Sequence, residues 1–129
     1  ALLDRSLAKD SSYADRCELV ERYWASANAD LRTGTSADSF WTFEQRVNSF
    51  KRLMEFDFLP NGCVMFRHAT WMTLLCWNLM GFSGSDDLAA FRRFQLGFPL
   101  PNGSVYELTR SAEGRWAVHF HSDPRRQVA

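Results

Sequence analysis

CVMFRHATWMTLLCWNLMGF, residues 63–82, is the most continuously apolar stretch of the chain, and the rest has to be organised around it. From Ala69 to Phe82 it is shorter than the about 20 apolar residues that a membrane-spanning helix needs. We therefore expect a buried element with other elements packed around it. The pattern favours a strand that becomes a helix near Ala69 and ends at Gly81, because glycine commonly terminates helices. A long strand through Cys76 is the alternative, since periodicity alone does not separate the two.

Two amphipathic helices are predicted before this stretch. The first begins after the capping residue Ser12 and should end near Gly34. Its apolar stripe comprises Tyr13, Cys17, Val20, Trp24, Ala27 and Leu31. The second follows residues 35–38, and its stripe comprises Phe40, Phe43, Val47, Phe50 and Met54. Its solvent-facing side should carry Glu44, Gln45, Arg46 and Lys51, while Trp41 lies off the stripe and is expected at a groove edge or exposed to a partner.

Strand and turn signals follow the second helix. Phe56-Asp57-Phe58 alternates, which should send Asp57 away from the two phenylalanines, and LPNG at 59–62 suits a tight hairpin turn. A further helix is predicted from the cap Ser85 to a stop at Gly97 and Pro99.

The last hairpin can be registered from its own pattern. A three-residue loop at 112–114, with glycine in the left-handed position, places Ser111 opposite Arg115. One face of the sheet is then apolar: Tyr106, Leu108, Trp116, Val118 and Phe120. The other carries Val105, Glu107, Thr109, Ala117, His119 and His121. A shift by one residue would mix the two sets, so this register is favoured.

These elements predict one α+β domain over residues 1–129, in which N-terminal amphipathic helices pack on a small antiparallel sheet with a C-terminal hairpin and enclose the central apolar segment. Residues 1–10 are weakly specified and could form a short helix or be flexible. The chain begins ALLDR without Met, which is typical of a processed protein or of a domain cut from a longer one.

Composition bounds the partners. The net charge is zero, with fifteen acidic and fifteen basic residues, so there is no electrostatic reason to expect nucleic acid as a partner. Eleven Phe and five Trp fill a thick core or leave a surface for a protein partner. Cys17, Cys63 and Cys76 lie among apolar neighbours without zinc-ligand spacing. We therefore expect buried, reduced thiols, a reducing cytoplasmic compartment, no metal and no cofactor.

A carboxylate and two imidazoles are the candidate catalytic residues. The predicted register places Glu107 opposite His119, with His121 two residues along the same face. A carboxylate beside an imidazole orients it for general acid or base catalysis. An ordinary polar pair on a solvated face is the simpler interpretation. His68 is expected to be a structural or cap-like histidine at the start of the central helix.

Two segments resemble the SnoaL-like proteins of the nuclear-transport-factor-two-like superfamily. CELVERYWASANADLRTG at 17–34 is similar to the first helix of that family, and GRWAVHFHSDP at 114–124 is similar to its closing strand. The resemblance implies helices packed into a curved antiparallel sheet, often dimeric, with an internal pocket that isomerases, cyclases and dehydratases use. It would be strengthened by a long strand over 63–77. No catalytic residue is carried over from it.

Three functions follow as hypotheses. The first is a non-catalytic binding or assembly domain, self-associating or bound to a protein partner, with Trp41, Trp71, Trp77 and Phe98 as candidate contact residues. The second is a SnoaL-like enzyme acting on a small apolar substrate. The third is a pathogen-derived or regulatory interaction module that uses the first two helices. GxSxG, P-loop, GxGxxG and HExxH motifs are absent from the sequence, and binding is preferred because no titratable pair is forced into a pocket.

Overall fold

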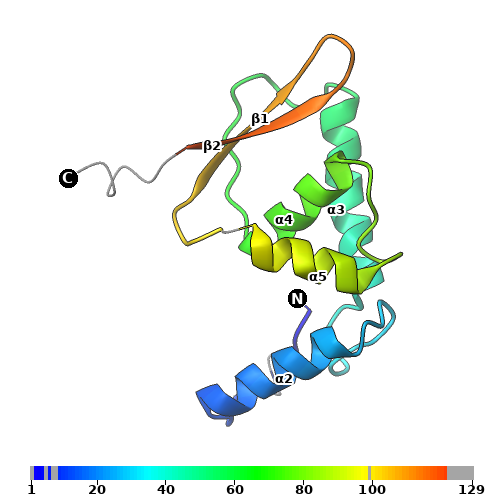
Figure 1. Cartoon of the computed structure of the whole chain (residues 1–129), viewed down its shortest axis with the longest axis vertical. Helices are drawn as coiled ribbons and strands as arrows, with labels where there is room; N and C mark the ends of the chain where they lie inside the picture. Colours follow the sequence, from blue (N-terminus) through cyan, green and yellow to red (C-terminus); the bar gives the residue numbers. More distant parts are fainter. Residues whose placement is uncertain (1, 5, 7–8, 99, 122–129) are drawn as a thin grey trace, which may run out of the picture.

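The computed structural model describes residues 2–4, 6, 9–98 and 100–121, and over these residues the chain is an α+β fold of four helices followed by a two-stranded antiparallel sheet. Figure 1 shows α2 at one end, the hairpin at the other, and the remaining helices between them. The elements are α2 (Tyr13–Ala25), α3 (Phe40–Glu55), α4 (Ala69–Leu79), α5 (Leu88–Gly97), β1 (Val105–Arg110) and β2 (Trp116–His121). Predictions for Pro99, for residues after 121 and for parts of 1–10 lie outside the described residues.

The central helix α4 begins at Ala69 as predicted, and the alternative of a long strand is wrong. Its middle is buried at Thr73, Leu74, Leu75, Cys76 and Asn78. Gly81 ends it in the left-handed region (φ +96°), where a residue without a Cβ is least strained. The Gly81 N–H donates to the Asn78 carbonyl (3.1 Å), and the next N–H donates to the Trp77 carbonyl (3.3 Å). This is a Schellman motif, completed by stacking of Phe82 on Trp77.

Helix α3 supplies much of the core. The Ser39 hydroxyl caps it by accepting the Thr42 N–H (3.1 Å). Phe40 and Val47 of the predicted stripe are fully buried. Glu44, expected on the solvent-facing side, is buried as well. That expectation was wrong because the loop before α5 folds over this side of the helix and supplies hydrogen-bond donors to the carboxylate.

The end of α3 replaces the strand expected at 56–58. Asp57 takes a left-handed conformation (φ +57°), and its N–H donates to the Met54 carbonyl (3.3 Å). The Phe58 N–H donates to the Leu53 carbonyl (3.0 Å), which makes a second Schellman motif. No residue of 56–68 lies in a strand, so the first predicted hairpin is wrong. The N–H groups of Asp57 and Phe58, which would have begun that strand, donate instead to the carbonyls at the end of α3.

Helix α2 is shorter than predicted and mostly exposed. It ends at Ala25 rather than near Gly34, and only Tyr23 is buried, with Trp24 half-buried beside it. Of the other residues of the predicted stripe, Tyr13, Cys17 and Ala27 are exposed, and Val20 and Leu31 are half-buried. The stripe was wrong because α2 packs on α5 through its C-terminal turn, where the Arg92 guanidinium lies 4.8 Å from the Trp24 ring.

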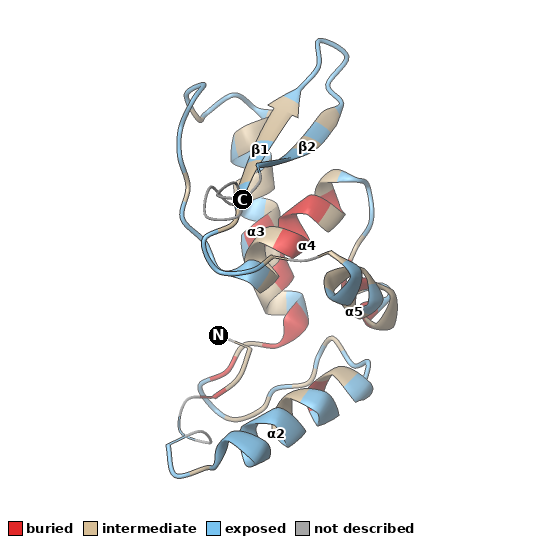
Figure 2. Cartoon of the chain, turned by 60° about the vertical axis from the view of Figure 1, so that its left-hand side comes forward, coloured by how far each residue is buried: buried red, intermediate tan, exposed pale blue. Residues whose placement is uncertain are grey.

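The core lies among α3, α4 and α5, as the burial colours of Figure 2 show. Its fully buried members are Phe40, Val47, Leu74, Leu75, Leu88 and Phe91. Helix α5 is capped by Asp87, whose carboxylate accepts the Ala90 N–H (2.9 Å), and not by Ser85 as predicted. Burying these aromatic and aliphatic groups contributes about 1.5–3 kcal/mol each, which explains why the three helices meet here.

The C-terminal hairpin has the predicted register, including Glu107 opposite His119 and Arg110 opposite Trp116. Its loop is the expected three-residue type, with Gly114 at φ +81° and the Ser111 N–H donating to the Arg115 carbonyl (2.8 Å). Several side chains join the hairpin to the helices, among them Leu108, which packs against the core. Arg110 donates to the Glu55 carbonyl at the end of α3 (2.8 Å), and Phe98 packs on Tyr106 with 5.4 Å between ring centroids.

Candidate functional site

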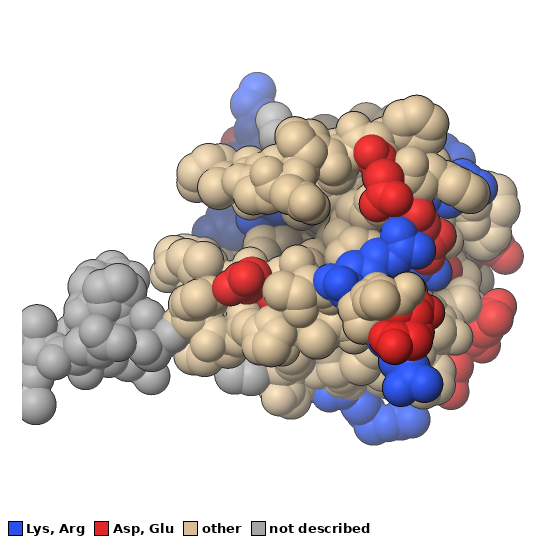
Figure 3. Space-filling model, turned by 90° about the horizontal axis from the view of Figure 1, so that it is seen from above, with Lys and Arg blue, Asp and Glu red and all other residues tan. Residues whose placement is uncertain are grey.

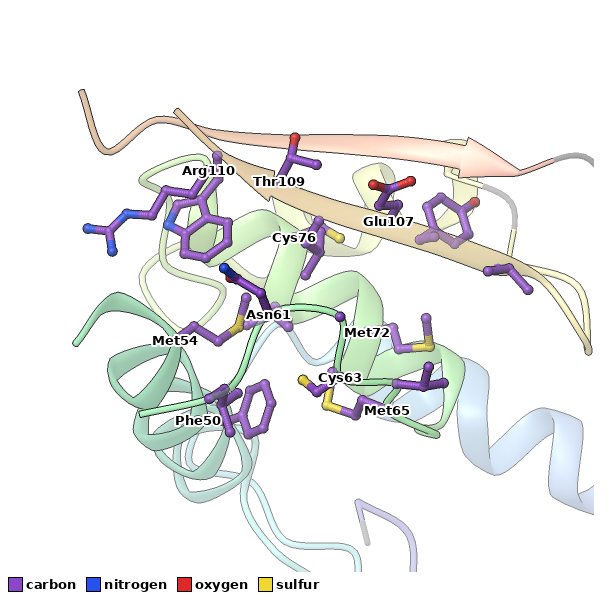
Figure 4. Close-up of a pocket in the computed structure, with 18 of the residues that line it drawn as sticks. Phe50, Met54, Asn61, Cys63, Met65, Met72, Cys76, Glu107, Thr109 and Arg110 are labelled. Carbon is purple, nitrogen blue, oxygen red and sulfur yellow. The ribbon is translucent and has the colours of Figure 1, made fainter. Parts of the chain in front are cut away.

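A groove of about 720 Å³ lies between β1 and the segment 59–66 that connects α3 to α4. Its floor comes from α3 and α4 through Phe50, Met54, Met72, Leu75 and Cys76. Figure 4 shows Met54, Met72 and Cys76 in the space beneath β1, with Asn61, Cys63 and Met65 coming from the connecting segment. The volume is in the range of ligand-binding clefts, and methionine side chains adapt readily to different apolar surfaces.

The wall formed by 59–66 is uncharged over its whole length and unusually apolar for a surface segment. Phe58, directly before it, is 73 % exposed, Val64 is 80 % exposed and Phe66 is 88 % exposed. Phe56, Val105 and Phe120 are further exposed apolar residues on the segments that border the groove. Figure 3, viewed from the hairpin end, shows a hollow with mostly uncharged walls. A large exposed apolar surface of this kind marks an interaction site more often than a solvated one.

The charged lining residues lie on β1 and beside it. At the loop end of β1, Arg110 Nη1 lies 3.8 Å from Asp57 Oδ1, and the Arg110 guanidinium also stacks 5.5 Å from the Trp116 ring. Glu107, in the middle of β1, has its Oε2 3.0 Å from His121 Nε2. The floor and the wall at 59–66 are uncharged.

The candidate catalytic residues are brought together only in part. Glu107 contacts His121 rather than its cross-strand neighbour His119, which instead hydrogen-bonds Thr109 Oγ1 (3.2 Å). The Glu107 and His121 side chains line the groove but are 56 % and 54 % exposed. Water therefore competes for both, and they form an exposed polar pair beside the groove. His68 is the N-cap residue of α4 and makes no side-chain capping bond.

The four residues predicted to contact a partner lie in different environments. Trp41 is 52 % exposed on α3, at a distance in sequence from the groove-lining part of that helix. Trp71 packs on Phe50, with 5.1 Å between ring centroids. Trp77 and Phe98 both contact Phe94, at 4.8 and 5.0 Å. Three of the four are therefore half-buried in ring contacts, and the exposed phenylalanines of 56–66 were missed because that stretch was assigned to strands.

The cysteines are not all buried as expected. Cys17 and Cys63 are exposed and Cys76 is buried. Cys17 lies on the exposed part of α2, and Cys63 lies in the segment that forms a groove wall instead of a strand. Burial raises the pKa of the Cys76 thiol to about 11, because the apolar surroundings disfavour the thiolate.

Glu44 is a buried acid that the sequence did not single out. Its Oε1 accepts from the Ser83 hydroxyl (2.9 Å) and the Ser85 N–H (3.1 Å), and its Oε2 accepts from the Gly84 N–H (2.6 Å). Every oxygen is therefore occupied by the loop that precedes α5, and the carboxylate does not line the groove. Glu44 holds this loop on α3 and has a structural role. A Glu followed by a Ser-Gly-Ser loop 40 residues later carries no sequence signal.

Two other properties bear on the possible functions. Among the described residues, no group of three or more His, Cys, Asp or Glu could hold a metal ion. In the same part of the chain, no helix has the length and apolar character needed to cross a membrane.

Comparison of the chain with protein-family models, curated proteins and solved structures gave no match. The likeness to SnoaL-like proteins thus remains a prediction from sequence. The long strand over 63–77 that would have strengthened it is not formed, since 69–79 is helical.

Proposed function

We propose that this chain is a small binding domain whose aromatic-rich surface at the hairpin end takes a protein partner, with no catalytic step. The observation that carries the proposal is the apolar groove with its uncharged, exposed wall over 59–66. Leaving this surface in water has an unfavourable free energy of about 25 cal/mol per Å² of apolar area, which a partner would recover on binding. Trp41, exposed on α3, is a second contact candidate.

The experiment is a selection of peptides from a displayed random library against the immobilised protein, followed by affinity measurements with two variants. Val64→Asp places a carboxylate on the groove wall, where an apolar ligand would leave it without a partner. Leu96→Asp is the matched control, because Leu96 is also exposed but lies on α5 away from the groove. We expect the selected peptides to lose about tenfold or more in affinity for Val64→Asp and to bind Leu96→Asp normally. Binders that tolerate Val64→Asp, or a selection without binders, would contradict the proposal.

A second candidate function is acid–base catalysis on a small apolar substrate in the same groove. It is supported by the 3.0 Å contact between Glu107 and His121, which both line the groove. In that case Glu107→Gln and His121→Gln would abolish turnover of the substrate, and both variants would still bind the substrate. If peptide binding depends on Val64 and is indifferent to both of these changes, the binding function is favoured.

A further inference from the structure

We propose that the partner enters the groove as an extended segment and adds a third strand to the sheet along the free edge of β1. This inference rests on the proposed binding function and names the conformation and chemistry of the ligand. The occupant is a stretch of partner chain with an uncharged, apolar middle, and its main chain pairs with β1.

The lining of the groove shows that it follows the edge of β1 and not one face. All six residues of β1, Val105–Arg110, line it, whereas β2 contributes only Trp116 and His121. Successive side chains of a strand point to opposite faces. A cavity that touches every residue of a strand must therefore run along its side, where main-chain groups are within reach.

The hydrogen-bond pattern of the hairpin identifies which main-chain groups face the groove. Ser111 and Arg115 form a hydrogen-bonded pair beside the loop, with the Ser111 N–H on the Arg115 carbonyl. Hydrogen-bonded and non-hydrogen-bonded pairs alternate along an antiparallel ladder, so Thr109 and Glu107 point their N–H and C=O toward β2. Leu108 and Arg110 must then point theirs away from β2. Within the described residues, nothing else pairs with these main-chain groups.

The opposite wall of the groove is a second backbone segment. Segment 59–66 lines the groove at every residue, and the floor of α3 and α4 closes it from below. We therefore place a single extended chain between β1 and this segment. Its outer neighbours would be the N–H and C=O groups of Leu108 and Arg110 on one side and Val64 on the other.

The distribution of charge defines the chemistry of that chain. The floor and the wall at 59–66 are uncharged, and the charged lining residues are Glu107 and Arg110 on β1 with their neighbours His121 and Asp57. A ligand side chain that carried a charge toward the floor would be desolvated against Met54, Met72 or Leu75 without a partner, which is unfavourable. Alternating residues place apolar side chains on the floor and small polar side chains toward the solvent. A charged residue is acceptable only on the side that faces the solvent.

The experiment titrates the ¹⁵N-labelled full chain with the uncharged peptide acetyl-Thr-Val-Thr-Val-Thr-Val-Thr-amide, up to about 1 mM, and follows amide exchange residue by residue. Strand addition should slow exchange of the Leu108 and Arg110 amides by about tenfold or more, because both acquire an acceptor. The Thr109 amide, already bonded to β2, should change little. Val64→Asp should weaken binding by about tenfold, and Leu96→Asp should leave it unchanged.

Three results would overturn the inference. The peptide could fail to bind, it could bind without slowing the Leu108 and Arg110 amides, or it could bind Val64→Asp as well as the parent chain. The outcome for the wider proposal is separate. If library-selected peptides depend on Val64 but leave these two amides unprotected, the domain binds partners in this groove in another conformation.

Discussion

Replacement of Glu44 by Gln tests whether this buried carboxylate holds the loop before α5. The change keeps the shape and volume of the side chain but turns one acceptor oxygen into an NH₂ donor. In one orientation of the amide the new NH₂ takes the place of Oε2, which accepts the Gly84 N–H at 2.6 Å in the parent. In the other orientation it takes the place of Oε1, which accepts the Ser85 N–H at 3.1 Å. Either way one buried backbone N–H loses its acceptor. The Ser83 hydroxyl can rotate to accept, so it does not add to the loss.

The expected magnitude follows from these contacts. A buried donor without a partner costs about 1–3 kcal/mol, and the remaining bonds lose the additional strength of a charged acceptor. We therefore expect Glu44→Gln to lower the free energy of unfolding by about 2–4 kcal/mol. This is a large part of the about 5–15 kcal/mol that stabilises a typical domain.

The measurement is urea unfolding followed by far-ultraviolet circular dichroism, in which the midpoint should fall while the slope stays constant. Glu18→Gln is the matched control, because Glu18 pairs with Arg22 on the exposed side of α2. It should change stability by less than about 0.5 kcal/mol. Faster amide exchange at Gly84 in the Gln variant would localise the effect to the loop. If the free energy of unfolding of Glu44→Gln lies within about 0.5 kcal/mol of that of the parent, the Glu44 carboxylate does not hold the loop on α3.

Other substitutions test further features of the fold. Gly84→Ala should destabilise the chain by about 1–3 kcal/mol in the same urea assay, because a Cβ there would lie 2.8 Å from the Phe40 ring and 2.9 Å from Glu44 Oε2; an unchanged midpoint would mean that the loop is not held closely on α3. Asp57→Gly should stabilise by about 0.5–1 kcal/mol, since Gly relieves the positive φ at the end of α3, whereas Asp57→Ala should not. The neutral Cys76 thiol contributes stability that is present below pH 9 and lost as the pH rises toward the folded-state pKa of about 11. Over this range the parent should lose roughly 2–3 kcal/mol more than Cys76→Ala, and parallel pH profiles would contradict the assignment.

The sequence predicted best the elements whose local pattern and tertiary environment agree. The hairpin register was recoverable because its loop has one glycine and its two strands separate cleanly into apolar and polar faces. The start of α4 at Ala69 and its end at Gly81 were recoverable for a similar reason, since glycine at a helix end relieves a positive φ.

Elements decided by non-local contacts were predicted less well. A regular apolar stripe on α2 indicated a fully packed helix, yet among the described residues of this helix only Tyr23 is buried, with Trp24 half-buried beside it. Glu44 has a surface helix pattern, but the loop at 83–85 brings donors to it from far along the chain. The groove was missed because its wall, 59–66, has the residue types of a turn and a strand. In the structure this segment forms neither a hairpin nor a strand. Strand propensity is realised only when a neighbouring strand is available to pair.

The two sides of the groove are held in different ways. β1 is fixed by its ladder to β2 and by the hydrogen bond of Arg110 to α3. In the described main chain of 59–66, the backbone hydrogen bond is a local one, from the Cys63 N–H to the Pro60 carbonyl. β1 is therefore the more rigid side of the groove, and segment 59–66 is the more flexible side. Fixing the backbone of one flexible residue when a ligand binds has an entropic cost of about 1–2 kcal/mol. Affinity at this site should accordingly be more sensitive to stiffening of the connecting segment than to any new contact made by the hairpin.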